Sequence, residues 1–144
     1  MTTTSAGPLP ASRLRGRGLL PLALVLDAAV TGANGAGYLA AAPLLGDVLG
    51  LPADVLRGVG LFLLCYAVVP GVVGTRRRTS LPAVRAVVAV NLAWAAGSVV
   101  VVALGSGTPT RVGVAWIVLQ ALVVGGFAAV QWVGLRRADG AVDG

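Results

Sequence analysis

The chain has 144 residues, of which 57% are hydrophobic and only 11% are charged, and its formal net charge is +6. Soluble domains carry about 25% charged residues, so this composition excludes an ordinary soluble domain. The sequence has no His, Glu or Lys and a single cysteine, Cys65, which excludes both a disulfide within the chain and a Cys/His metal cluster. We therefore expect neither a bound metal nor a cofactor.

Four long apolar segments follow one another along the chain. They cover residues 18–42, 53–74, 82–104 and 112–135. Each is long enough to cross a bilayer, because a helix of about 20 apolar residues spans roughly 30 Å of hydrocarbon. An N-terminal tail, 1–17, and a C-terminal tail, 138–144, are predicted to be disordered. The sequence thus predicts an all-α membrane protein with one four-helix transmembrane bundle over residues 18–137.

Prolines and glycines indicate where the helices end. Pro43 is expected to end the first helix, because proline cannot supply the next N–H of the helical ladder. Residues 44–51 would then turn at the outer surface, and Pro52 would begin the second helix. Pro70 is expected to kink or end that helix. The Gly-, Ser- and Pro-rich residues 105–110 predict a tight outer turn between the third and fourth helices.

The arginines are distributed unequally between the two sides of the predicted bundle. Nine of the eleven lie on one side: Arg13, Arg15, Arg17, Arg76, Arg77, Arg78, Arg85, Arg136 and Arg137. By the positive-inside rule this side is cytoplasmic, which predicts a multi-pass membrane protein with both termini in the cytoplasm. The use of Arg without Lys and the richness in Ala, Gly and Val fit a high-GC bacterial sequence, so we expect the inner membrane of a bacterium. Arginines next to a membrane attract anionic lipid headgroups, so lipid rather than nucleic acid is the expected partner of this charge.

The first segment also has features of a secretory signal. The basic residues 13–17 precede an apolar run, and the small residues 33–36 offer a cleavage site. However, the apolar character continues through residue 42, and Asp27 interrupts the run. We therefore favour an uncleaved first span, with a cleaved signal peptide as the alternative.

A row of polar side chains lies along the first segment. Asp27, Thr31, Asn34 and Tyr38 are spaced i, i+4, i+7 and i+11, so they share one face of a helix. We place Asp27 near the middle of the membrane, where an exposed carboxylate costs about 2.5–3.5 kcal/mol, and we expect it to face protein. Asn91 lies about nine residues into the third segment, which also starts inside, and is therefore predicted to lie level with Asp27.

A second polar layer is predicted further out, where Asn34 and Gln120 lie at nearly the same depth. Gln131 is interpreted as a cap of the inner rim, and Trp94 as either a core residue or the wall of a small-molecule pocket. The candidate intramembrane polar site therefore consists of Asp27, Thr31, Asn34, Asn91 and Gln120. Amide and hydroxyl groups of this kind often only join helices, so a structural role for them remains open beside a functional one.

Small residues spaced by four predict which helices pack together, because they let helix backbones approach closely. The predicted packing residues in the first, third and fourth segments are Gly32, Ala36, Ala93, Gly97 and Gly125. The second segment has large side chains and no such row. It is therefore predicted to be the most lipid-facing helix.

Parts of the chain resemble a known group of proteins. The runs are residues 26–35 (LDAAVTGANG), 91–94 (NLAW) and 131–137 (QWVGLRR). They resemble small four-span membrane proteins of high-GC bacteria to which no activity is assigned, so the resemblance implies a fold and no activity. The small multidrug-resistance transporters are similar in size, span count and the presence of an acid in the first helix, although that acid is a glutamate.

Two functional hypotheses follow from the sequence. The first is a non-catalytic membrane protein that acts as a structural, partner or regulatory subunit. The alternative is a small proton-coupled transporter that uses Asp27. An enzyme is not expected, because no nucleophile and base pair is visible. A homo-oligomer or a membrane-protein partner is compatible with either hypothesis.

Overall fold

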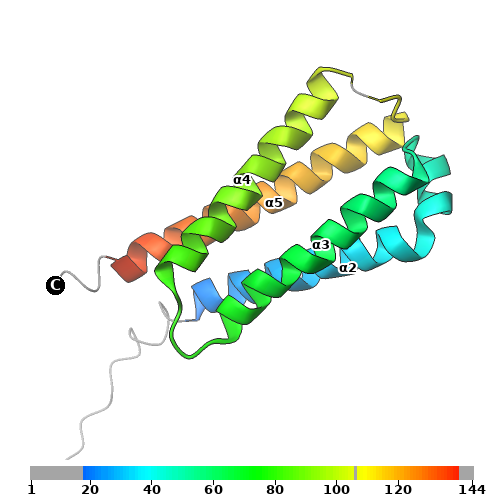
Figure 1. Cartoon of the computed structure of the whole chain (residues 1–144). Helices are drawn as coiled ribbons and strands as arrows, with labels where there is room; N and C mark the ends of the chain where they lie inside the picture. Colours follow the sequence, from blue (N-terminus) through cyan, green and yellow to red (C-terminus); the bar gives the residue numbers. More distant parts are fainter. Residues whose placement is uncertain (1–17, 106, 140–144) are drawn as a thin grey trace, which may run out of the picture.

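The computed structural model describes residues 18–105 and 107–139, which form four α-helices (Figure 1). These are α2 (Leu19–Leu49), α3 (Ala53–Thr75), α4 (Leu81–Ala103) and α5 (Arg111–Asp139). All four are long and apolar enough to cross a membrane, which confirms the predicted fold class of a four-helix bundle. The predicted tails 1–17 and 140–144 lie outside the described residues, whereas residues 138 and 139 belong to α5.

The helices form two antiparallel hairpins that lie side by side (Figure 1). α2 packs most extensively on α3, and α4 packs on α5. The two hairpins are joined mainly where α2 contacts α5, while α3 and α4 touch much less. α2 and α5 therefore form the centre of the bundle.

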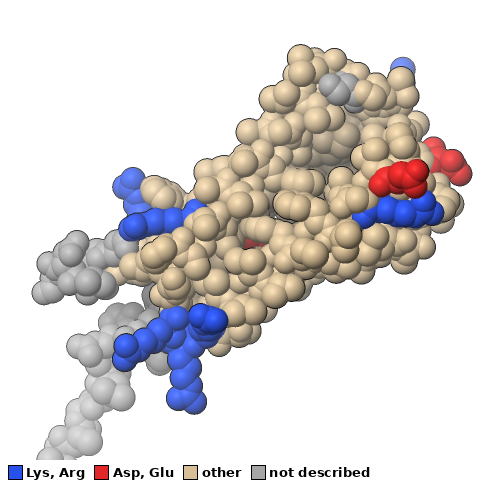
Figure 2. Space-filling model, viewed as in Figure 1, with Lys and Arg blue, Asp and Glu red and all other residues tan. Residues whose placement is uncertain are grey.

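The two ends of the bundle differ in charge. The inner end, as we name it here, carries the connection between α3 and α4, the start of α2 and the end of α5 (Figure 1). Exposed arginines gather at this end (Figure 2): Arg76, Arg77, Arg78, Arg136 and Arg137. The opposite, outer end carries Asp54, which forms an exposed ion pair of 2.8 Å with Arg57.

Two clusters of buried apolar side chains fill the bundle. The inner cluster takes residues from all four helices: Leu20, Leu24, Val73, Val84, Val87, Val88, Ala128 and Leu135. The buried members of the outer cluster come only from α2 and α3: Tyr38, Ala42, Leu49, Leu56 and Leu63. The inner half is thus a four-helix core, and the outer half is a two-helix core with α4 and α5 beside it.

α4 leaves the core halfway along its length. Its buried residues, Val84, Val87, Val88 and Asn91, all lie in its first half. Within the described part of α4, no residue after Asn91 is buried. Val99 and Leu104 are 60% and 74% exposed. α4 therefore diverges from α3 toward the outer end, as Figure 1 shows.

The backbones of α2 and α3 approach each other closely. A Cβ atom on Gly35 would lie 2.7 Å from the Gly60 carbonyl oxygen, and one on Gly71 would lie 3.4 Å from the Ala28 Cβ. The prediction that the second segment has no small-residue face was therefore wrong. Small residues recur every seven positions along α3, as Gly60, Ala67 and Gly74, and this spacing suits left-handed helix crossings. The prediction rested on a spacing of four residues.

The predicted packing residues behave differently from one another. Gly32 packs, but on Ala67 of α3, at 3.6 Å from the position of its missing Cβ. Ala36, Ala93 and Gly97 are exposed, and nothing lies within 4 Å of a Cβ built on Gly97, so their predicted role between helices of this chain was wrong. Gly125 makes only a distant contact, since its Cβ would lie 4.0 Å from that of Ala95. The divergence of α4 explains why its small residues face outward.

The first helix does not end at Pro43 as predicted. α2 contains Pro43, bends at Ala41, whose φ of −124° and ψ of 23° are not helical, and continues to Leu49. It ends at Gly50, which adopts a left-handed conformation with φ 70°. The extra turns persist because Ala42 and Leu49 on both sides of the proline are buried. α3 contains Pro70 and ends five residues later, at Thr75.

Candidate functional site

A network of hydrogen bonds surrounds Asp27 in the inner half of the bundle. Its Oδ2 accepts hydrogen bonds from Asn91 Nδ2 at 2.7 Å and from Gln131 Nε2 at 2.8 Å. Its Oδ1 accepts one from the Thr31 hydroxyl, one turn along α2, at 3.1 Å. Asn91 Nδ2 also approaches Gln131 Oε1 at 3.3 Å. The predicted level of Asn91 with Asp27 is thereby confirmed.

Tyr66 brings α3, the remaining helix, into this network. Its hydroxyl donates to Asn91 Oδ1 at 2.8 Å and approaches the Val87 carbonyl oxygen at 3.3 Å. The Tyr66 ring stacks with Phe62, which in turn stacks with Trp94 of α4, with ring centroids 6.3 and 5.6 Å apart. The Asp27 network, as we name the set Asp27, Thr31, Tyr66, Asn91 and Gln131, therefore joins α2, α3, α4 and α5.

The centre of the Asp27 network is buried and fully hydrogen-bonded. Asp27 and Gln131 are 0% exposed and Asn91 is 2% exposed. Among the described residues, no buried side-chain nitrogen or oxygen lacks a hydrogen-bond partner. This is what a buried polar group in a bilayer requires, because hydrocarbon offers no replacement partner.

The network lies about two turns from the inner ends of α2 and α5. Asp27 lies eight residues after the start of α2 at Leu19, and Gln131 lies eight residues before the end of α5 at Asp139, or about 12 Å in each case. Asp27 therefore lies in the first third of the 31 residues of α2, because this helix continues past Pro43 at its outer end.

Sequence reasoning missed two residues of the network, Tyr66 and Gln131. Gln131 was interpreted as a cap of the inner rim, with the fourth segment predicted to end four residues later at residue 135. α5 instead continues through both arginines to Asp139, which places Gln131 two turns into the helix. Counting depth from this end of the helix would have placed Gln131 beside Asp27.

The contacts of Asp27 suit either protonation state. An ionised carboxylate accepts all three hydrogen bonds, since it has no proton to donate. A neutral acid with its proton on Oδ1 keeps the bonds from Asn91 and Gln131 on Oδ2 and donates to the Thr31 hydroxyl, which can also accept. Thr31 is thus the partner whose hydrogen bond can reverse.

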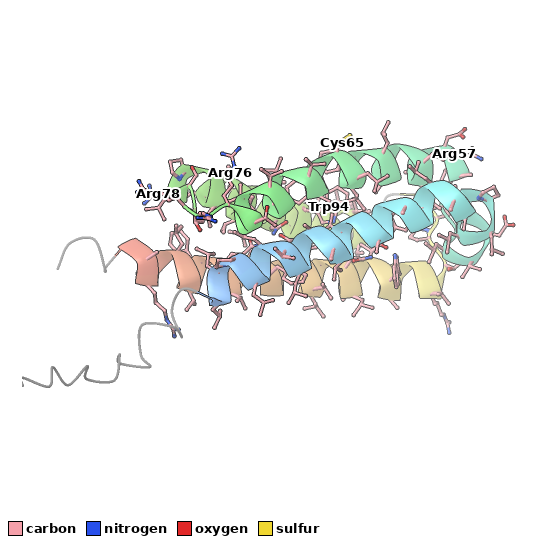
Figure 3. All side chains as sticks on the ribbon, turned by 90° about the horizontal axis from the view of Figure 1, so that it is seen from below. Arg57, Cys65, Arg76, Arg78 and Trp94 are labelled. Carbon is pink, nitrogen blue, oxygen red and sulfur yellow. The ribbon has the colours of Figure 1, made fainter. Side chains whose placement is uncertain are left out.

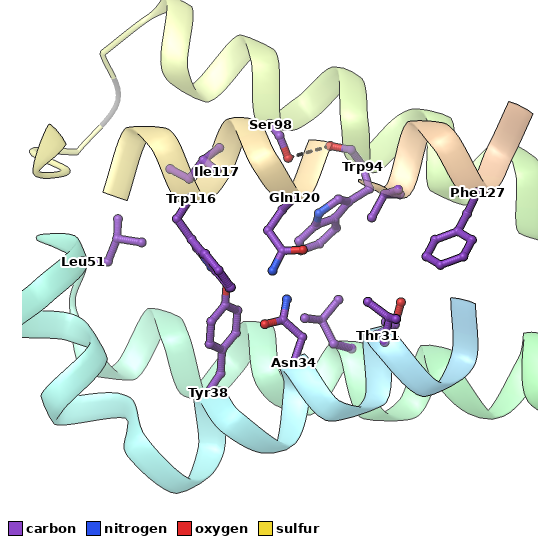
Figure 4. Close-up of a pocket in the computed structure, with 13 residues that line it drawn as sticks. Thr31, Asn34, Tyr38, Leu51, Trp94, Ser98, Trp116, Ile117, Gln120 and Phe127 are labelled. Atoms are coloured by element: carbon purple, nitrogen blue, oxygen red, sulfur yellow. Dashed lines mark hydrogen bonds between the residues drawn. The ribbon is translucent and has the colours of Figure 1, made fainter. Parts of the chain in front are cut away.

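The second predicted layer forms a separate cavity toward the outer end. The side chains of Asn34 and Gln120 line a cavity of about 80 Å³ and point toward each other across it (Figure 4). Within residues 18–105 and 107–139 neither amide has a hydrogen-bond partner, and both are half-buried. Thr31 also lines this cavity, so its side chain lies between the Asp27 network and the open space.

Aromatic side chains form much of the cavity wall. Trp116 Nε1 donates to the Tyr38 hydroxyl at 2.7 Å, which joins α5 to α2. Trp94 and Phe127 close other sides (Figure 4). Trp94 lies between the helices, whereas the exposed Cys65 of α3 points away from them (Figure 3). Trp94 therefore lines the cavity and also packs against the outer apolar cluster, so the structure supports both interpretations of this residue.

The cavity adjoins a larger apolar groove between α3 and α4. This groove has a volume of about 530 Å³ and shares Tyr38, Trp94 and Ser98 with the cavity. Its other walls are mainly valine and leucine side chains of both helices, and the surface is hollowed there (Figure 2). The groove exists because α4 diverges from α3, so it opens sideways, toward lipid in a membrane.

The chemistry available to these groups is limited to hydrogen bonding and proton exchange. Among the described residues, no cluster of three His, Cys, Asp or Glu side chains could hold a metal ion. The cavity is lined by amides, hydroxyls and aromatic rings and by no charged side chain. Comparisons with protein-family models, curated proteins and solved structures found no match to this chain.

Proposed function

We propose that this chain is a non-catalytic multi-pass protein of the bacterial cell membrane that serves as a structural, partner or regulatory subunit. The observation that carries this proposal is the saturated, unexposed state of Asp27, bonded to Thr31, Asn91 and Gln131. A carboxyl group that exchanges with substrate needs an accessible face. Here the carboxyl group instead joins helices.

The test compares two replacements of Asp27. Asp27→Asn can keep all three contacts, because its oxygen accepts from Asn91 and Gln131 while its NH₂ donates to the Thr31 hydroxyl. A joining role therefore predicts a near-native melting temperature in detergent for Asp27→Asn and a large decrease for Asp27→Leu. Equal melting of wild type and Asp27→Leu would contradict the proposal.

The proposed orientation places the inner end of the bundle in the cytoplasm. The arginines of that end support it, since basic residues next to transmembrane helices favour the cytoplasmic side. In a Cys65→Ser background, Thr108→Cys is expected to react with an impermeant thiol reagent in intact cells, and Ser80→Cys only after permeabilisation. The reverse pattern would contradict this orientation.

One observation favours proton-coupled transport as a second candidate. Thr31 contacts Asp27 and also lines the outer cavity, so a proton can pass between the carboxyl group and that cavity through one hydroxyl. Infrared difference spectra across pH would show a carboxyl band that titrates and that is lost in Asp27→Asn. A band that does not change with pH would remove this candidate.

A further inference from the structure

The outer cavity has donors that no protein group uses. Asn34 and Gln120 each present an amide with two N–H donors and one acceptor, and in the part of the chain that the structure describes neither has a partner. The Tyr38 hydroxyl accepts from Trp116, so its own proton remains free to donate. Inside a bilayer such groups need a partner, which only water or a ligand can supply here.

The lining defines the charge and shape of that ligand. No charged side chain lines the cavity, so neither an anionic nor a cationic head group finds a counter-ion there. Trp94 and Trp116 offer flat apolar faces on which a ring can stack. A volume of about 80 Å³ holds several water molecules, or a head group of about one ring.

The groove beside the cavity suits a hydrocarbon tail. Its wall on α4 runs from Val90 to Val101, a length of about 16 Å. It is apolar, it meets the cavity at Trp94 and Ser98, and it opens sideways. A molecule dissolved in the lipid can therefore enter with its tail in the groove and its head at the amides.

The geometry points to a binding site for a neutral lipid whose head group is a single ring with carbonyl oxygens, such as an alkylated benzoquinone. The ring lies between the indoles of Trp94 and Trp116, and its oxygens accept hydrogen bonds from Asn34 and Gln120. The site does not depend on the role of Asp27, which the cavity does not reach. The proposed ligand binds beside the apolar core and the Asp27 network, both of which form without it.

Tryptophan fluorescence tests this proposal on the full-length protein in detergent. The background carries Cys65→Ser, because thiols add to quinones, and Trp132→Phe, because Trp132 lies outside the cavity against Arg136. The two remaining tryptophans both line the cavity. A methylated 1,4-benzoquinone with a decyl tail is expected to quench them saturably, whereas decylbenzene, which lacks the oxygens, is expected to give only weak, linear quenching.

Variants of the two amides complete the test. Asn34→Leu and Gln120→Leu are each expected to weaken the binding of the decylquinone about five-fold, because each removes one hydrogen bond to a carbonyl oxygen. Leu122→Ala, on the exposed face of α5, is the control and is expected to bind as the background does. Melting in detergent checks folding, and Asn34→Ala, which adds no bulk, replaces the leucine variant if that variant does not fold.

Three results would overturn the assignment. The first is equal binding of the decylquinone by the background and by both amide variants. The second is equal binding of decyltriphenylphosphonium, which carries the same tail on a cationic head. The third is the absence of saturable quenching by any probe, which would leave water as the occupant of the cavity.

Discussion

The bundle contains polar side chains at two depths, and it treats them in opposite ways. In the inner half, the side-chain nitrogens and oxygens of Asp27, Asn91 and Gln131 bond to one another and are shielded from solvent. In the outer half, Asn34 and Gln120 face each other across a cavity and have no partner among the described residues. The same residue types therefore join helices at the inner level, whereas at the outer level their hydrogen-bonding groups remain unused.

The cause of this difference is the path of α4. Its first half is buried against the other helices and brings Asn91 to Asp27. Its second half diverges, and no described side chain of α4 forms a hydrogen bond with the amides of Asn34 and Gln120. A polar side chain inside a membrane protein thus cannot be assigned a joining role from its depth alone, because the helix opposite it has to be close as well.

The largest expected effect comes from removing the centre of the inner network. Asp27→Leu leaves the donors of Thr31, Asn91 and Gln131 buried without an acceptor, and we expect a loss of about 3 kcal/mol in the free energy of unfolding. Unfolding by sodium dodecyl sulfate in mixed micelles measures it. The control is Asn34→Leu in the outer level, which breaks no hydrogen bond and should change stability by less than about 0.5 kcal/mol. Equal losses in the two variants would contradict the distinction between the levels.

The next effect concerns the close backbone packing of α2 on α3 in the outer half. Gly35→Ala forces a Cβ to within 2.7 Å of the Gly60 carbonyl oxygen, so α2 and α3 must separate, and we expect a loss of about 2 kcal/mol. Gly37→Ala is the matched control two residues along the same helix, where nothing lies within 4 Å. The same unfolding titration compares them. If Gly35→Ala is as stable as Gly37→Ala, close backbone packing does not hold this half.

Part of this arrangement can be predicted from the sequence. The four spans follow from the length of the apolar runs, and the pairing of Asp27 with Asn91 follows from counting residues along two helices that start at the same end. Gln131 was missed because the fourth helix was predicted to end at residue 135, whereas α5 continues through two arginines to Asp139. Long arginine side chains reach the interface from within a helix, so their position does not mark where the helix ends.

Other features depend on tertiary contacts that a single sequence does not contain. Small residues occur on every helix, and only the structure shows that those of α3 meet α2 while those of the outer half of α4 face outward. The continuation of α2 past Pro43 has the same origin, because packing of Ala42 and Leu49 outweighs the lost hydrogen bond. The cavity follows from the divergence of α4 and was therefore not predictable as a volume.

A smaller effect compares two glutamines on one helix. Gln131→Leu removes a donor to Asp27 and an acceptor for Asn91, and we expect a loss of about 1 kcal/mol. Gln120→Leu removes an amide with no partner, so stability should stay the same or rise slightly. Because both changes are from glutamine to leucine on α5, helix propensity and side-chain size cancel in the comparison. A larger loss for Gln120→Leu than for Gln131→Leu would reverse the assignment of the two levels.

The smallest effect concerns Thr31, which belongs to both levels. Thr31→Val keeps the shape of the side chain and removes only the hydroxyl that bonds Asp27 Oδ1. We expect a loss of about 0.6 kcal/mol or less, because this value is the average for a hydrogen bond between transmembrane helices and the bond of Thr31 lies within one helix. Thr75→Val is the control, because the Thr75 hydroxyl bonds only to carbonyls of its own exposed turn. Combined in a double-mutant cycle with Asp27→Leu, which removes the acceptor of this bond, Thr31→Val should show a coupling of similar size. If neither the loss nor the coupling is observed, water from the cavity replaces the hydroxyl. The dry region then ends at Asp27 rather than at Thr31, and the carboxyl group is open to proton exchange.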